Sequence, residues 1–283
     1  MPTVKAFITK HAVATYFALT FAISWGGVLA VAGPKIPATR EEFERLLPSV
    51  VVMMLAGPSF AGILLTGLVS GKSGLRELRS RLLKWRVGAR WYAAALLIAP
   101  ALMTALLLGL SLFSPEFRPG IVVTADKTIF VLSGFAIALG AGIFEELGWT
   151  GFAIPTLRLR YGVLATGLMV GLPWAAWHLF GAVLASGILS GTLSLASYLL
   201  DPFLLLVAFR VLMVWVYDRT ESLLVGILMH VSLTGSARII GAPGIAGLPL
   251  LTFDLIWFAA VWAVVAVVAV ADGAALATAA AGR

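Results

Sequence analysis

Long apolar segments alternate with short polar connections along nearly the whole chain. We expect membrane-spanning helices at residues 11–32, 49–70, 91–113, 128–152, 162–185, 193–217, 221–240 and 247–271. A helix needs about 20 apolar residues to cross a bilayer. The runs are continuous rather than alternating, which favours helices over a closed barrel. The pattern therefore predicts an all-α fold, a polytopic membrane helical bundle of about eight transmembrane helices, with residues 1–283 in a single membrane domain.

Two acidic residues bear on the boundaries of these spans. Asp201 and Pro202 fall inside the sixth segment, so that helix is predicted to begin either near residue 193 or later, near residue 202. Asp254 lies close to the start of the eighth segment. We expect its carboxylate at the interface between lipid and water, because a charge is costly inside the bilayer.

Composition narrows the class of protein further. Of the 283 residues, 61% are hydrophobic and only 12% are charged, whereas a soluble domain has about 25% charged residues. The formal net charge is +7. The positive side chains lie between apolar segments, so anionic membrane lipid is a better partner for them than nucleic acid. The absence of cysteine excludes disulfides and thiolate metal ligands.

The connection at residues 71–90 predicts the orientation of the chain. It holds seven Lys and Arg residues against one acid, Glu77. Positively charged loops remain on the cytoplasmic side, and eight spans would then leave both termini in the cytoplasm, in a protein expected in the plasma membrane. The connection is also predicted to form a short interfacial helix. The residues expected on its apolar face are Leu75, Leu78, Leu82 and Trp85.

Besides Asp201, Asp254 and the residues at the ends of the spans, five charged or histidine residues lie inside the predicted spans. They are Glu145, Glu146, His178, Arg210 and His230. An ionisable residue within a membrane is costly, so each is a functional hypothesis by default. Two neighbouring carboxyl groups can divide the roles of proton donor and proton acceptor in general acid–base catalysis. The alternative is a structural pair bonded to arginine or to helix ends.

The two histidines lie on separate predicted helices, in a chain that has three histidines in total. Together with the glutamates they supply carboxylate oxygens and imidazole nitrogens. Such a set can activate water directly, or it can hold a Zn²⁺ that does so. Trp149, Trp174 and Trp177 flank these residues, and we expect them to pack, to anchor the helices at the interface or to line a substrate groove.

Three stretches of the chain resemble a known family. They are EELGWTGFAIPTLRLRYG, which contains both glutamates, PWAAWHLF, which contains His178, and DRTESLLVGILMH, which ends at His230. Over residues 130–240 the order and spacing resemble the CAAX protease and bacteriocin-processing family (CPBP, also called ABI), which includes the type II CAAX prenyl endopeptidases. The resemblance implies that residues 130–240 form the catalytic core of an intramembrane protease.

The first motif of that family is Glu-Glu-x-x-x-Arg, and this chain departs from it. Thr150 occupies the position of the arginine. Glu146 therefore lacks the charge partner that the family pattern implies. Arg210 is otherwise unexplained in the sixth span, and we expect it to supply that charge from another helix.

Two further motif positions also differ from the family pattern. Trp174 replaces the phenylalanine of Phe-x-x-x-His and keeps an aromatic ring four residues before His178. Thr234 takes the polar position four residues after His230, where the family has asparagine or a similar residue. A threonine hydroxyl can still donate a hydrogen bond to an oxyanion.

The resemblance implies a role for each matched residue. Glu145 with His178 would activate a water molecule for attack on a peptide bond, and Glu146 would be a supporting carboxylate. His230 with Thr234 would stabilise the oxyanion. If a Zn²⁺ is present, the expected ligands are Glu145, His178 and His230.

We therefore expect a hydrolase, an intramembrane endopeptidase that cleaves a membrane-associated peptide or protein. Two other classes stay open. The chain could be a non-proteolytic immunity protein or scaffold of the same family, which the substitution at Thr150 favours. It could also be a transporter with a Glu and His proton relay, but the sequence has no pair of interrupted spans in matching halves.

Overall fold

The described part of the chain consists of helices and the turns and loops that join them. The computed structural model describes residues 4–188 and 192–272, and no β-strand occurs within those ranges. The helical elements in chain order are α1 (Val4–Lys10), α2 (Ala12–Ala32), α3 (Arg40–Leu82), α4 (Ala89–Ser111), η1 (Pro115–Phe117), α5 (Gly120–Val123), α6 (Lys127–Gly148), η2 (Trp149–Ala153), α7 (Ile154–Arg158), α8 (Val163–Ala185), η3 (Ser186–Ile188), α9 (Thr192–Thr220), α10 (Leu223–Ile239) and α11 (Gly247–Asp272). The all-α prediction is confirmed.

Within the described ranges, seven helical segments are long and apolar enough to cross a membrane, judged by length and composition. They correspond to seven of the eight predicted spans. The remaining one, predicted at 221–240, is α10, an apolar helix of 17 residues, which is about 25 Å long. The predicted polytopic helical bundle is therefore confirmed. The sixth predicted span is α9. This helix begins at Thr192 and continues through Pro202, so the prediction of a later start near residue 202 is wrong.

The second span belongs to a longer helix than the sequence indicated. α3 begins at Arg40, where the Thr39 hydroxyl accepts a hydrogen bond from the Glu42 N–H. Its backbone departs from helical geometry at Gly71, which has a φ of 62°, and then continues as helix to Leu82. Glycine adopts a positive φ without a steric penalty, so this position can bend the helix. The expected interfacial helix is thus the end of α3, and Trp85 lies beyond it.

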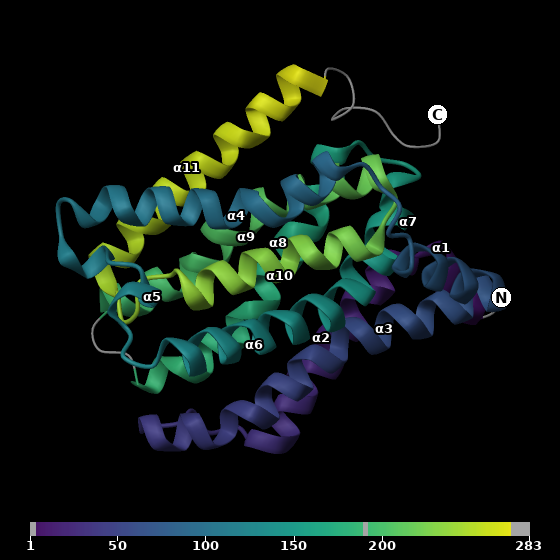
Figure 1. The fold of residues 1–283 in the computed structure, drawn as a ribbon. Helices are drawn as coiled ribbons and strands as arrows, with labels where there is room; N and C mark the ends of the chain where they lie inside the picture. The colour runs from purple at the N-terminus through teal and green to yellow at the C-terminus, as the bar shows by residue number, and fades with distance from the viewer. Residues whose placement is uncertain (1–3, 189–191, 273–283) are drawn as a thin grey trace.

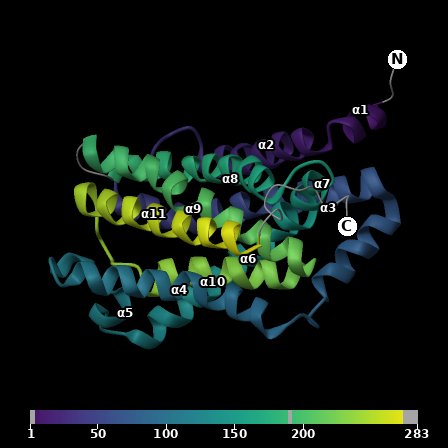
Figure 2. The same ribbon diagram turned by 90° about the horizontal axis from the view of Figure 1, so that it is seen from above.

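α9 lies within the bundle and contacts α4 and α10 (Figure 1). It also contacts both α8 and α11, while α10 lies between α4 and α6, an arrangement that Figure 2 shows from above. α9 is the most buried of the seven long segments. Arg210, near the middle of α9, is fully buried.

Asp254 on α11 was expected at the interface between lipid and water, and that expectation is wrong. Its side chain is fully enclosed by protein. α11 packs against α9, so the first turns of α11 have a protein-facing side that the sequence pattern does not reveal.

A single π-helical turn interrupts the fourth span. It covers Trp149–Ala153, directly after α6, and α7 follows from Ile154. The sequence predicted one continuous span to residue 152. Isolated π turns occur mostly as bulges within α-helices and often mark functional sites. All five residues of this turn are buried, and the turn begins three residues after Glu146.

Candidate active site

A buried carboxylate, an arginine and a histidine form the centre of the site. Arg210 on α9 donates from Nη1 and Nη2 to the two oxygens of Glu146 on α6, at 2.8 and 2.9 Å. Both side chains have no exposed area. The Nδ1 atom of His230 on α10 lies 2.6 Å from Glu146 Oε1. Helix α6 and the consecutive helices α9 and α10 thus meet at one carboxylate.

The hydrogen bonds of Glu146 fix the arrangement of protons on His230. The Arg210 guanidinium stabilises the ionised form of Glu146, and an ionised carboxylate can only accept hydrogen bonds. The Nδ1 atom of His230 must therefore carry the hydrogen that it shares with Glu146. In the neutral ring, Nε2 then presents a lone pair, and it lies 3.9 Å from Glu145 Oε1.

Thr150, at the position of the missing motif arginine, also contacts Glu146. Its hydroxyl donates to Glu146 Oε2 from the π turn, one turn after the carboxylate on the same chain segment. Glu146 therefore accepts hydrogen bonds from Arg210, Thr150 and His230. The family motif has an arginine at position 150. Here a threonine hydroxyl at that position and an arginine from another helix together satisfy the carboxylate.

Glu145, the neighbouring carboxylate, is held differently. It is 3% exposed, and its Oε2 atom accepts a hydrogen bond of 2.7 Å from the indole Nε1–H of Trp174 on α8. Its Oε1 atom faces His230 Nε2, at a distance too long for a direct hydrogen bond. One oxygen of Glu145 is thus committed, and the other is available for chemistry.

His178 lies on the same helix as Trp174, one turn later. Its Nδ1 atom is 2.9 Å from the Trp174 carbonyl oxygen, which can only accept, so Nδ1 carries the hydrogen and Nε2 is the basic nitrogen. Its ring packs against those of Trp174 and Trp177. In the described part of the chain it makes no hydrogen bond or ion pair with either glutamate. Unlike the carboxylates, it is only half-buried, so it lies on the accessible side of the site.

Thr234 was predicted to act with His230 at the oxyanion. It lies one turn after His230 on α10 and is half-buried. Among the residues that the structure describes, its hydroxyl makes no hydrogen bond to Glu145, Glu146 or His178.

Close packing of the helices brings these residues together. A methyl group added at Gly148 would collide with the Pro58 carbonyl oxygen of α3 and the Tyr16 hydroxyl of α2. A Cβ atom at Gly171 would lie 3.2 Å from the Val207 backbone and 3.3 Å from the Cβ atom of Arg210. Small residues thus let α8 approach α9, and let α6 approach α2 and α3, at the level of the site.

The zinc site that the sequence allowed, with Glu145, His178 and His230 as ligands, stays a prediction. No group of three or more His, Cys, Asp or Glu side chains in residues 4–188 and 192–272 is placed to hold a metal ion. His230 Nδ1 and both oxygens of Glu146 are engaged in hydrogen bonds. No step of the mechanism below runs through a metal.

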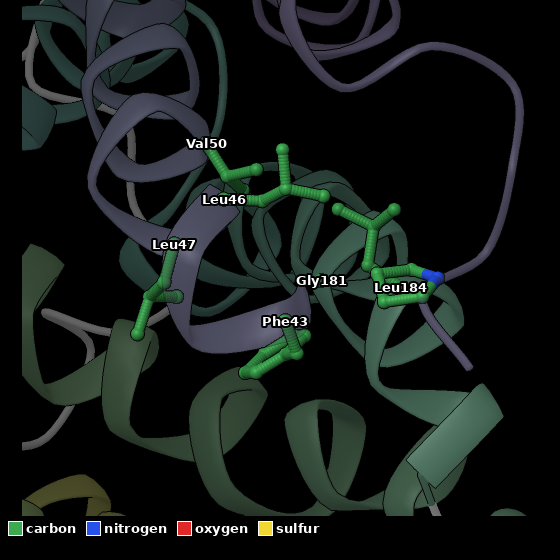
Figure 3. Close-up of a pocket in the computed structure, with 7 residues that line it drawn as sticks. Phe43, Leu46, Leu47, Val50, Gly181 and Leu184 are labelled. Atoms are coloured by element: carbon green, nitrogen blue, oxygen red, sulfur yellow. The ribbon is translucent and has the colours of Figure 1, made fainter. Parts of the chain in front are cut away.

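Two hollows lie elsewhere in the molecule. The apolar pocket in Figure 3 has a volume of about 40 Å³ and lies between the start of α3 and the end of α8, with Phe43 and Leu184 among its walls. A polar cavity of about 610 Å³ lies at the ends of α3, α7 and α9, and the ion pairs Arg158–Asp218 and Lys84–Glu221 line it. Neither hollow is lined by the residues of the site.

The sequence did not indicate that Trp174 and Thr150 hold the two glutamates. Trp174 was expected to pack, anchor a helix or line a groove, and Thr150 counted only as a missing arginine. One signal was available for the tryptophan: a buried indole N–H usually finds a hydrogen-bond acceptor. Its acceptor could not be identified, because the partner lies on another helix.

Two comparisons with known proteins bear on this site. Residues 127–235 match the model of a family described as Type II CAAX prenyl endopeptidase Rce1-like. A protein of Methanococcus maripaludis named CAAX prenyl protease 2 is 25% identical over 173 residues, which cover 58% of this chain and 60% of that protein. The match thus spans less than two thirds of the relative. The predicted family resemblance is confirmed, and with the apolar helices it makes the chain an integral, multi-pass membrane protein.

Proposed function

We propose that this chain is an intramembrane endopeptidase that cleaves a membrane-associated peptide or protein, and the match of residues 127–235 to the type II CAAX prenyl endopeptidase Rce1-like model supports the proposal. One observation carries the proposal. Glu145 is buried with Oε2 held by an indole N–H, while Oε1 faces His230 Nε2 across 3.9 Å. A water molecule fits between these two atoms as a bridge, because each hydrogen bond would need about 2.8 Å.

In the proposed first step, Glu145 is the general base. A water molecule on the accessible side of the site is hydrogen-bonded to Glu145 Oε1 and oriented by His178. As its oxygen attacks the peptide carbonyl carbon, Oε1 takes its proton. Burial of the carboxylate supports this role, because a base without competing bulk water is selective for the one positioned water.

The attack places a negative charge on the former carbonyl oxygen. We assign its stabilisation to the Thr234 hydroxyl and to His230 as an imidazolium, which carries a hydrogen on both ring nitrogens throughout the cycle and donates from Nε2 without giving that hydrogen up. Glu146 would stabilise that imidazolium through Nδ1, and Arg210 keeps Glu146 ionised for the purpose. A donor of this kind contributes about 10²- to 10³-fold to the rate.

The second step returns the proton. Protonated Glu145 gives the proton from water to the leaving nitrogen, the carbon–nitrogen bond breaks, and the products are a carboxylate and an amine. Glu145 regains its starting state. Glu146 holds the geometry of His230 throughout, and it neither gains nor loses a proton.

The substrate is a proposal of its own. The Methanococcus maripaludis relative is named CAAX prenyl protease 2. A farnesylated CAAX peptide with a fluorophore and quencher on either side of the scissile bond is therefore the first probe. Peptides from wild-type and inactive membranes, compared by N-terminal proteomics, form the second.

The test of the function is Glu145→Gln in purified protein reconstituted into liposomes. The amide preserves size and can still accept from Trp174, but it cannot act as a base. We expect cleavage to fall by about 10²- to 10⁴-fold, the usual contribution of a general base, with an unchanged thermal unfolding midpoint. Glu116→Gln, at an exposed position in η1, is the matched control and should cleave like the wild type. A chelator added to the same assay reports on any metal requirement.

Equal cleavage by Glu145→Gln and the wild type would contradict the proposal. Absence of cleaved peptide with either probe, in a folded wild-type protein, would favour a non-proteolytic membrane scaffold.

A further inference from the structure

Trp174 contacts several residues of the site, by hydrogen bonds as well as by packing. Its side chain is 1% exposed, and its indole Nε1–H donates to Glu145 Oε2 at 2.7 Å. Its carbonyl oxygen accepts from His178 Nδ1. A single residue of α8 thus joins the carboxylate of α6 to the histidine that lies on the accessible side.

The ring of Trp174 also contacts the residues on the other side of the site. The guanidinium carbon of Arg210 lies 3.8 Å from the ring centroid, within the range of a cation–π contact. The His230 ring approaches edge-on, with centroids 5.3 Å apart. These contacts fix the plane of the indole, and the direction of its N–H is fixed with it.

The orientation of Glu145 depends on that N–H. Within the described residues, no other group donates a hydrogen bond to Glu145. The terminal torsion of a glutamate has a broad, nearly two-fold preference, so an unheld carboxylate can exchange its two oxygens by rotation. A phenyl ring at this position would fill similar space but leave both oxygens without a donor.

We propose that Trp174 is a positioning residue for the hydrolytic step: its indole N–H holds Glu145 Oε2, so that Oε1 is the oxygen that receives the proton from water. The inference rests on the proposed function and deepens it. It assigns different tasks to the two oxygens of one carboxylate. It also gives a tryptophan, rather than any aromatic residue, a specific task at position 174.

The first arm of the test measures the hydrogen bond without any assay of cleavage. The nine tryptophans are labelled with ¹⁵N in the indole ring, and the Trp174 cross-peak is the one that Trp174→Phe removes. In Glu145→Gln the Trp174 N–H proton should move upfield, because an amide oxygen is a weaker acceptor than a carboxylate. The cross-peak of Trp257, whose Nε1–H donates to the Leu205 carbonyl oxygen, should not move.

The second arm measures cleavage in the liposome assay. Trp174→Phe should lower kcat by about 10- to 100-fold with KM within about twofold, since misplacement of a reacting group affects the step rather than binding. Trp257→Phe removes a buried indole hydrogen bond far along the chain and should leave both constants unchanged. If Trp174→Phe misfolds, 3-benzothienylalanine at position 174 keeps the indole shape and removes only the N–H.

Each outcome decides the inference. An upfield shift together with a loss confined to kcat supports it. An unmoved Trp174 resonance in Glu145→Gln overturns it, and so does a wild-type kcat in Trp174→Phe or in the isostere while Glu145→Gln is inactive. If Glu145→Gln itself cleaves normally, the proposed function fails, and the inference fails with it; the resonance then reports only on the hydrogen bond.

Discussion

Ion pairs occur in two regions of this molecule, the candidate active site and the polar cavity, and they differ in their exposure to solvent. In the site, Glu146 and Arg210 are both 0% exposed and share two hydrogen bonds. At the polar cavity, Lys84 and Glu221 are 41% and 74% exposed and meet through one contact of 3.2 Å. The Arg158–Asp218 pair beside them is 3% and 5% exposed. The three ion pairs therefore form a series of increasing exposure to solvent. Glu146–Arg210 is the most buried, Arg158–Asp218 follows, and Lys84–Glu221 is the most exposed.

This series predicts at which ion pair the removal of one charge has little effect on the free energy of unfolding. In water, screening and side-chain freedom reduce a surface pair to a small contribution. In the interior, the loss of one partner leaves a charge that nothing solvates. Glu146 is also the acceptor that fixes the hydrogen on His230, so its pair carries a chemical role that the exposed pair lacks.

The largest effect is expected from Arg210→Met. This change leaves Glu146 buried without its cation, and we expect a loss of about 3–5 kcal/mol in the free energy of unfolding together with loss of cleavage. Denaturant titration in detergent micelles measures the first quantity, and the liposome assay measures the second.

The matched control for that prediction is the double variant Arg210→Met with Glu146→Gln. It removes both charges, so stability should return towards the wild-type value while cleavage stays low, because His230 has lost its anionic acceptor. A single variant as stable and active as the wild type would show that the pair has no such role.

An intermediate effect is expected from Arg158→Met. Nε and Nη2 of Arg158 both donate to Asp218 Oδ1, at 2.8 and 2.5 Å, beside a cavity that water can enter. Charged hydrogen bonds of this kind contribute about 1.5–3 kcal/mol. Unfolding should therefore become easier by that amount, with kcat per folded molecule unchanged. A loss as large as that of Arg210→Met would break the proposed gradient.

The smallest effect is expected from Lys84→Ala. Exposed pairs contribute about 0–1 kcal/mol, and salt reduces the value further. Denaturant titrations at low and high salt should give nearly the same free energy of unfolding for this variant and the wild type. A salt-dependent difference above that range would mean that the pair fixes the end of α3 against α9.

Much of the fold was predictable because hydrophobic length is a local property. The positions of the long helices, and the set of ionisable residues that lie within them, follow from runs of apolar residues. The sequence pattern predicted interruptions within helices least well. Pro202 lies inside α9, and the helix of α3 resumes after Gly71, because neighbouring helices stabilise segments that their own residues would interrupt.

From the sequence alone we predicted a membrane helical bundle, with Glu145, Glu146, His178 and His230 as ionisable residues inside its spans. The sequence also left one arginine and one glutamate in need of partners. The structure confirms that Arg210 reaches Glu146, and it adds two contacts that the sequence did not indicate: Trp174 binds one oxygen of Glu145, and Thr150 donates to Glu146. The reason is geometric: composition and spacing specify what each helix buries, whereas the partner of a buried polar group depends on how closely, and at what angle, another helix approaches it.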